Sequence, residues 1–157
     1  MEPVRTMAEE KGLTLERTNR FGIYLDMTVK AIKQDIIRRF RNEEIDLTPE
    51  QWSILNMVSV GEVAQRELAA ATFKDAPTVS RIVDLLESKG YITRKADVAD
   101  RRRLLIGITS EGIGMLKQSM PIIIDARKRG WNGLNEEDYD HLKRILDRIY
   151  SNIQQDQ

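Results

Sequence analysis

Apolar residues recur every three or four positions along most of this chain, which is the spacing of amphipathic helices. The first eighteen residues show only weak periodicity, so a flexible arm and a short extra helix both remain open for them. The predicted helices lie at about residues 19–44, 48–60, 64–71, 75–89, 110–128 and from 135 onward.

In each predicted helix one stripe of apolar side chains should face away from water. The opposite face of the first helix carries charged residues such as Lys30, Asp35 and Arg41. The expected stripes are Leu25, Val29, Ile32, Ile36 and Phe40; Trp52, Leu55 and Val58; Leu68; Val79, Ile82, Val83 and Leu86; and Tyr139, Leu142, Leu146 and Ile149.

Capping residues and prolines mark the boundaries of these helices. Thr48 and Gln51 have the spacing of a capping box at a helix start. Asp75 is a good N-cap, and Pro77 falls in the first turn after it. Pro121 is expected to kink or divide its helix, because proline removes a backbone donor from a helix interior. The other predicted boundaries are a stop at Lys89–Gly90, a start at Thr109 or Ser110 and a start at Asn135.

After Gly90 the apolar period shortens towards two, which is typical of strands. Residues 91–95 and 104–109 fit two strands, joined by a polar, charged connection at 97–103. A short helix, a three-residue turn, a second helix and a strand hairpin together make a winged helix-turn-helix. The predicted fold class is therefore mainly α with a small β-hairpin.

The chain is expected to form a single domain over residues 1–157, with parts that serve different roles. Residues 47–109 make the winged helix-turn-helix region. The first helix at 19–44 looks longer than the core of a small domain requires. Long amphipathic helices at chain ends often pair with a partner subunit, so residues 19–44 and 110–157 are the expected dimerisation helices.

Composition excludes several kinds of chemistry. The chain has no cysteine, which rules out thiol chemistry, and one histidine, His141, so a metal site would need carboxylates almost alone. No metal site and no cofactor are expected. No glycine-rich phosphate loop, nucleophile elbow or histidine–carboxylate dyad is present, so we expect no enzyme. No apolar run approaches the roughly 18 residues of a membrane span, and no signal peptide is found, so a cytoplasmic location is expected.

Charge is balanced overall but polarised along the chain. The 25 basic and 25 acidic residues give a formal net charge of zero. Residues 94–103 hold five basic and two acidic residues, a local charge of +3, whereas residues 131–157 hold three basic and six acidic, a local charge of −3. The positive cluster therefore coincides with the predicted hairpin tip.

The order of these elements suits duplex DNA. The second helix of a helix-turn-helix reads base edges with its N-terminal end in the major groove. Thr78 and Arg81 lie off the buried stripe of that helix, and the hairpin can carry Arg102 to a flanking minor groove. A winged-helix module that contacts proteins, without specific DNA binding, is the alternative.

Four aromatic residues leave a second question open. Phe21, Tyr24, Phe40 and Trp52 fit the lining of an effector pocket, but they fit plain core or dimer packing equally well. The sequence assigns no ligand-binding residue.

The stretch from Leu47 to Gly112 resembles the multiple antibiotic resistance regulator family, known as MarR. Its most specific mark is Asp-x-Arg, here Asp100 and Arg102, before an apolar strand that ends at Thr109. The flanking helices match the family in placement and length. The other matching stretches are LTPEQW at 47–52, RELA at 66–69, TVSRIVD at 78–84 and LESKGYI at 86–92.

The resemblance implies a homodimeric transcriptional regulator, most often a repressor, that binds a pseudo-palindromic DNA operator. Many members release DNA when a small, often aromatic or phenolic, effector binds between the dimer and DNA-binding regions. Asp100 would hold the wing arginine in position. The chain departs from the family at Phe73, where glycine is common in the turn, and at Ala64, where a capping threonine is common. It also departs at Ala76 and Pro77, where lysine and serine are frequent. The predicted DNA-binding residues are Asp75, Ala76, Pro77, Thr78, Ser80, Arg81, Asp100, Arg101, Arg102 and Arg103.

Overall fold

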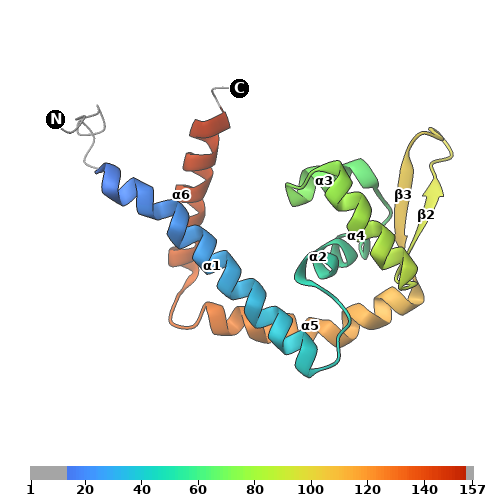
Figure 1. Ribbon diagram of the computed structural model, residues 1–157, viewed down its shortest axis with the longest axis horizontal. Helices are drawn as coiled ribbons and strands as arrows, with labels where there is room; N and C mark the ends of the chain where they lie inside the picture. The colour runs from blue at the N-terminus through green and yellow to red at the C-terminus, as the bar shows by residue number, and fades with distance from the viewer. Residues whose placement is uncertain (1–13, 155–157) are drawn as a thin grey trace, which may run out of the picture. The chain divides into compact units, whose positions relative to one another are not determined.

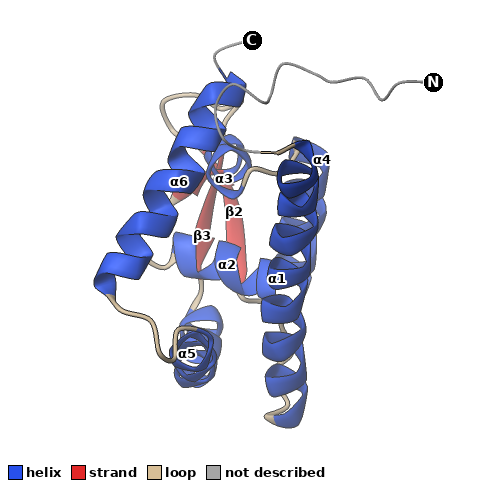
Figure 2. Ribbon diagram, turned by 90° about the vertical axis from the view of Figure 1, so that its left-hand side faces the viewer, coloured by secondary structure: helices blue, strands red, loops and turns tan. Residues whose placement is uncertain are grey.

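The computed structural model describes residues 14–154, which form six helices and one small antiparallel sheet (Figures 1 and 2). The predicted fold class, mainly α with a small β element, is confirmed. The chain divides into two compact units within its fifth helix, between Ile123 and Ile124. The elements are α1 (Leu15–Asn42), α2 (Pro49–Val58), β1 (Val63–Ala64), α3 (Gln65–Thr72), α4 (Ala76–Ser88), β2 (Ile92–Ala96), β3 (Leu104–Ile108), α5 (Ser110–Gly130) and α6 (Glu136–Gln154).

Side-chain caps mark the starts of α1 and α2. Thr48 Oγ1 accepts a hydrogen bond from the Gln51 N–H at 3.1 Å, and Gln51 Oε1 accepts one from the Thr48 N–H at 3.0 Å. This reciprocal pair is the predicted capping box, which satisfies two backbone donors at the start of α2. At α1 the cap is Thr14, whose side chain accepts from the Arg17 N–H, so this helix begins at Leu15, before its predicted start.

Pro121 is predicted to kink or divide its helix, and division is wrong, because α5 runs as one element from Ser110 to Gly130. A kink stays a prediction. Proline removes one backbone donor, which leaves the carbonyl of Lys117 without its helical partner. Lys117 and Pro121 are both exposed, so water can reach that carbonyl. Leu116 and Ile123 are buried on either side of the proline and hold the helix to the core.

The sheet contains one strand more than the predicted hairpin. β2 and β3 pair antiparallel with Ile92 opposite Ile108, as expected for a hairpin. The short strand β1 adds to the other edge of β3, where Val63 lies opposite Ile106, and gives the order β1-β3-β2. A strand of two residues is too short to show an alternating pattern, so β1 could not be predicted from the sequence.

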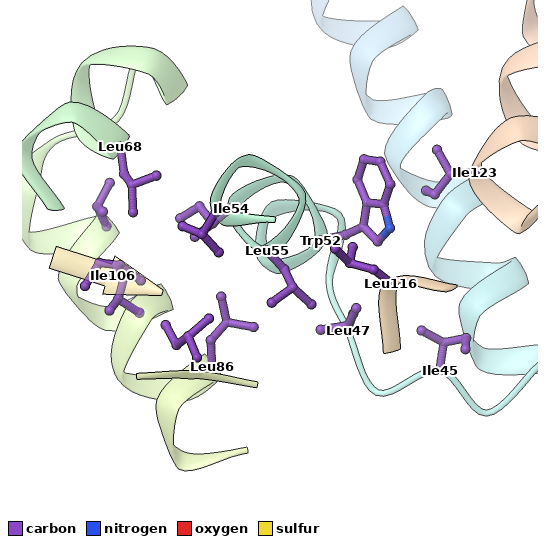
Figure 3. Packing of buried hydrophobic residues seen from close by; sticks show 14 of the residues in the cluster. Ile45, Leu47, Trp52, Ile54, Leu55, Leu68, Leu86, Ile106, Leu116 and Ile123 are labelled. Carbon is purple, nitrogen blue, oxygen red and sulfur yellow. The ribbon is translucent and has the colours of Figure 1, made fainter. Parts of the chain in front are cut away.

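A hydrophobic core connects the helix-turn-helix to the sheet and to the first half of α5 (Figure 3). Val79, Val83 and Leu86 of α4 are fully buried, which confirms three of the four residues in the stripe predicted for this helix. Figure 3 shows Trp52 of α2 facing Leu116 and Ile123 of α5. The indole Nε1 donates a hydrogen bond to Ser119 Oγ at 3.0 Å, so the only polar atom of the indole is satisfied inside the core.

The unit that begins at Ile124 contains the end of α5 and all of α6. Asn135 caps α6 as predicted, since its Oδ1 accepts from the Asp138 N–H at 3.0 Å. The rings of Trp131 and Tyr139 pack with their centroids 5.5 Å apart. No residue of α6 is buried in the single chain, and Leu142 on its apolar stripe is 45% exposed. None of the described helices combines the length and apolarity needed to cross a bilayer.

Candidate nucleic-acid interface

The turn between α3 and α4 fixes where the second helix of the helix-turn-helix begins. Phe73 ends α3 in the left-handed conformation with φ +52°, and its N–H donates to the carbonyl of Ala70. Asp75 then caps α4, because its Oδ1 accepts from the Thr78 N–H at 2.8 Å and its Oδ2 from the Thr78 hydroxyl at 2.9 Å. The start of α4 is therefore held by a double hydrogen bond.

The outward face of α4 carries most of the residues predicted to read DNA. Thr78 and Arg81 are exposed, as are Ala76 and Pro77 in the first turn. Ser80 is half-buried, so its hydroxyl is less available than the sequence pattern indicated. Contact of these residues with DNA remains a prediction.

The tip of the wing is ordered by two aspartates. Asp100 Oδ1 accepts from the Arg102 N–H at 3.0 Å, and Asp97 Oδ1 accepts from the Ala99 N–H at 2.9 Å. Asp100 thus caps the turn through the backbone of Arg102, and this hydrogen bond does not involve the Arg102 side chain. The side chains of Arg101 and Arg102 are exposed at this tip.

Arg103 differs from the two arginines before it, because carboxylates surround its guanidinium group. Its Nη2 lies 3.1 Å from Oε1 of Glu67 on α3, and its Nη1 lies 3.7 Å from Oδ2 of Asp97 at the base of the tip. Its side chain is 31% exposed. Arg103 therefore links the wing to α3 in the DNA-free chain.

Arg94 makes the corresponding link from β2 to α4. Its guanidinium group pairs with the carboxylate of Asp84, and its Nε lies 3.3 Å from Oε2 of Glu87. Both acidic residues belong to α4. Each surface ion pair contributes at most about 1 kcal/mol, but together they fix the wing against both helices. The sequence predicted a DNA contact for Arg103 and only basic charge for Arg94. Neither ion pair could be predicted, since ion pairs between separate elements leave no mark in a linear pattern.

A cavity of about 340 Å³ opens where the wing meets the two helices. It shows that the first residue of α4 and the wing arginines lie on the same side of the protein. Its lining residues are Ala64, Gln65, Arg66, Ala76, Asp100, Arg102, Arg103 and Leu104.

The four aromatic residues left open by the sequence separate into two kinds. Phe40 and Trp52 are core residues, 1% and 5% exposed. Tyr24 on α1 is 56% exposed, and Phe21 is half-buried. Phe40 and Trp52 therefore belong to the core.

The cap at Asp75 predicts a pH dependence of stability. The hydrogen bonds from the backbone and hydroxyl of Thr78 lower the pKa of Asp75 below its usual value. A depressed folded-state pKa contributes stability above the unfolded-state pKa, and this contribution is lost as pH falls through the folded-state pKa. Asp75→Asn keeps the acceptor oxygen but cannot titrate, so its urea unfolding midpoint should fall less than that of the unmodified chain between pH 7 and acid pH. Equal falls in both proteins would contradict the assignment.

Comparison with known proteins places this arrangement in a family. A family model described as MarR family matches residues 45–103. The HTH-type transcriptional regulator SarZ of Staphylococcus saprophyticus is 34% identical over 107 residues, which cover 66% of this chain and 69% of SarZ. The chain belongs to the MarR family. It is therefore a transcriptional regulator, and the family expected from the sequence is confirmed.

Solved structures extend the likeness beyond the matched segment. A probable transcriptional regulator from Pseudomonas aeruginosa is 27% identical, with a TM-score of 0.70, over 84% of this chain and 98% of that one. MepR of S. aureus, solved in complex with DNA, is also 27% identical, with a TM-score of 0.76, over 84% of this chain and 97% of MepR. AbsC from Streptomyces coelicolor, 20% identical with a TM-score of 0.78 over 90% of this chain and 97% of AbsC, shares the fold.

The MarR family match sharpens what is unusual about this chain. The matched segment runs from the loop before α2 to the end of the wing tip, so it includes the whole helix-turn-helix. Within it, Phe73 occupies a left-handed position that glycine adopts most readily. Ala64 has no capping side chain, and its N–H instead donates to Glu67 Oε2 at 3.3 Å. These two departures lie at the ends of α3, and the departures at Ala76 and Pro77 lie in the first turn of α4.

Proposed function

We propose that this MarR-family regulator binds duplex DNA as a homodimer and recognises a pseudo-palindromic operator. Each subunit would place α4 in the major groove, with half-sites about one helical turn apart. Thr78 and Arg81 would meet base edges or phosphates, with Ser80 in a lesser role, and the Asp75–Pro77 end would approach the DNA backbone. Binding, and not catalysis, is the proposed activity, and the cytoplasm is the proposed location.

The observation that carries this proposal is the shared side of α4 and the wing. Ala76 at the start of α4 and Arg102 at the wing tip line the same cavity. A duplex that binds on this side of the protein can therefore contact the N-terminal end of α4 and the wing at the same time. The ion pairs of Arg94 and Arg103 support this geometry, because Arg94 links the wing to α4 and Arg103 links it to α3. We assign Arg103 a bracing role in addition to the DNA contact predicted for it.

The exposed apolar faces of the terminal helices support the homodimer. On α1, Val29 and Ile32 are 49% and 54% exposed. On α6, Tyr139 and Tyr150 are 47% and 52% exposed. Contiguous apolar faces of this kind on a single chain mark surfaces that a partner covers. Both helices are therefore the proposed dimerisation elements.

The test of the function is fluorescence anisotropy with a duplex from upstream of the protein's own gene and with a random duplex. Specific binding should exceed random binding by about a thousandfold or more at physiological salt. The logarithm of affinity should fall linearly with the logarithm of salt concentration, by about 0.9 for each neutralised phosphate. Equal, weak binding to both duplexes would favour the protein-interaction module instead.

Arg102→Ala is expected to weaken DNA binding and to flatten its salt dependence. An exposed arginine that enters a minor groove displaces condensed counterions, so its loss should reduce the slope by about 0.9. Arg129→Ala is the matched control, because it removes the same charge from the end of α5, outside the wing. A slope that Arg102→Ala leaves unchanged would remove the wing tip from the mechanism.

We propose that regulation is repression relieved by a small aromatic or phenolic effector. The effector would shift the population between dimers whose recognition helices have matching and non-matching spacing. It must therefore bind one spacing more tightly than the other. A thermal-shift screen of phenolic acids tests this idea, and a screen without any stabilising compound would count against it.

A further inference from the structure

Phe73 combines a strained backbone with an exposed aromatic side chain. Its backbone is left-handed, with φ +52°, a conformation that costs free energy for any residue with a bulky side chain. The residue is also 81% exposed in the single chain. Glycine at this position would relieve the backbone strain, because it adopts positive φ freely. A residue held in this way at a binding surface calls for a functional explanation.

The position of Phe73 in the chain indicates what the ring meets. It lies two residues before Asp75, the cap of α4, and its N–H is fixed to the carbonyl of Ala70. The start of α4 faces the same cavity as the wing arginines. Phe73 therefore lies next to the helix end that the proposed function places in the major groove.

We propose that Phe73 contacts the 5-methyl group of a thymine in the major groove, beside the N-terminal end of α4. This inference rests on the proposed function. The thymine methyl is the apolar group that base pairs present in the major groove, and phenylalanine is one of the side chains that recognise it by apolar contact. Contact removes from water both the methyl group and a ring that is exposed in the free protein. Phe73 would thus be a specificity-determining residue without charge.

The proposal predicts opposite effects of one substitution on stability and on binding. Phe73→Gly should raise the melting temperature of the full chain by about 2–4 °C, because the left-handed strain is relieved. The same change should lower affinity for a specific duplex by about tenfold, the typical effect of losing one base contact. Affinity for random DNA and the salt slope should stay the same, since no charge is lost.

Duplexes that the full-length protein selects from a random pool serve as probes, so the operator need not be known. Each thymine of a selected duplex is replaced in turn by deoxyuridine, which removes only the methyl group. The unmodified protein should lose affinity at one thymine in each half-site, and Phe73→Gly should be insensitive at that same thymine. Phe73→Leu keeps an apolar side chain and should retain most of the methyl dependence. The comparison of thymine and deoxyuridine duplexes can be made with the unmodified protein. Its result therefore remains valid even if a substitution disturbs folding.

Val60→Ala is the control for loss of an exposed apolar side chain. Val60 is 90% exposed and precedes β1, whose register with β3 places it towards the base of the wing, away from the tip. Val60→Ala should leave the affinity for every duplex unchanged. Undiminished specific binding by Phe73→Gly, or equal losses on thymine and deoxyuridine duplexes, would overturn the thymine contact. If the unmodified protein selects no sequence from the pool, the proposed function itself fails, and the contact fails with it.

Discussion

The substitution Gly112→Ala is expected to destabilise the chain severely, because no space exists for the Cβ atom of alanine at this position. A Cβ built on Gly112 would lie 2.1 Å from the carbonyl oxygen of Tyr91 and 2.8 Å from Cγ1 of Ile108. Both neighbours belong to the base of the wing, and the nearer one is backbone, which cannot rotate away. We expect Gly112→Ala to lower the free energy of unfolding by about 3 kcal/mol or more.

The hydrogen bonds around Gly112 explain why relaxation is costly. The Thr109 hydroxyl accepts from the Gly112 N–H at 3.0 Å and donates to the carbonyl of Gly90 at 2.6 Å. The Thr109 N–H donates to the Tyr91 carbonyl at 3.0 Å. These bonds tie the first turn of α5 to the start of β2. A shift of α5 away from Tyr91 would break them and move the base of the wing.

Gly114→Ala is the matched control for this prediction. It lies on the same helix two residues later, and a Cβ there would meet no other atom within 4 Å. Alanine in an open helix position should raise stability by about 0.5–1 kcal/mol. Thermal unfolding of the two variants should therefore shift in opposite directions, with Gly112→Ala lower by about 6–12 °C. A Gly112→Ala protein as stable as the unmodified chain would contradict the close approach of α5 to Tyr91.

The parts of the fold that depend on neighbours in sequence could be predicted from sequence. The capping box of Thr48 and Gln51, the Asp75 cap and the α4 stripe are all defined within one or two helical turns. The strand β1 and the continuity of α5 through Pro121 could not be predicted. Both depend on packing against distant residues, which a local pattern does not contain.

The candidate site divides along the same line. The exposure of Thr78 and Arg81 follows from helical periodicity, and the turn capped by Asp100 follows from a short motif. The roles of Arg94 and Gly112 depend on elements that approach only in three dimensions. Periodicity therefore locates the surface proposed to meet DNA, whereas tertiary contacts determine how rigidly that surface is held.

Aspartate at position 142 is expected to convert the protein to a monomer and to abolish high-affinity DNA binding. Leu142 lies on the apolar stripe of α6 and is 45% exposed in the single chain, so its replacement should leave the monomer folded. In a dimer that covers this stripe, each subunit would bury an unpaired carboxylate. An unpaired buried charge costs several kcal/mol, so the dimer dissociation constant should rise by about a thousandfold. Sedimentation equilibrium measures this directly.

Loss of the dimer should lower the affinity for DNA, because the two half-sites of an operator are bound by one dimer. When one recognition helix of a dimer is bound, the second binds at high effective concentration, and a monomer lacks this advantage. Leu142→Asp should therefore bind a two-site operator only as tightly as a single half-site. His141→Asp introduces the same carboxylate at an exposed neighbouring position off the apolar stripe, so it should remain dimeric and bind normally. A Leu142→Asp protein that stays dimeric would show that α6 lies outside the interface. A stable monomer that still discriminates the full operator would show that dimerisation is not the source of affinity.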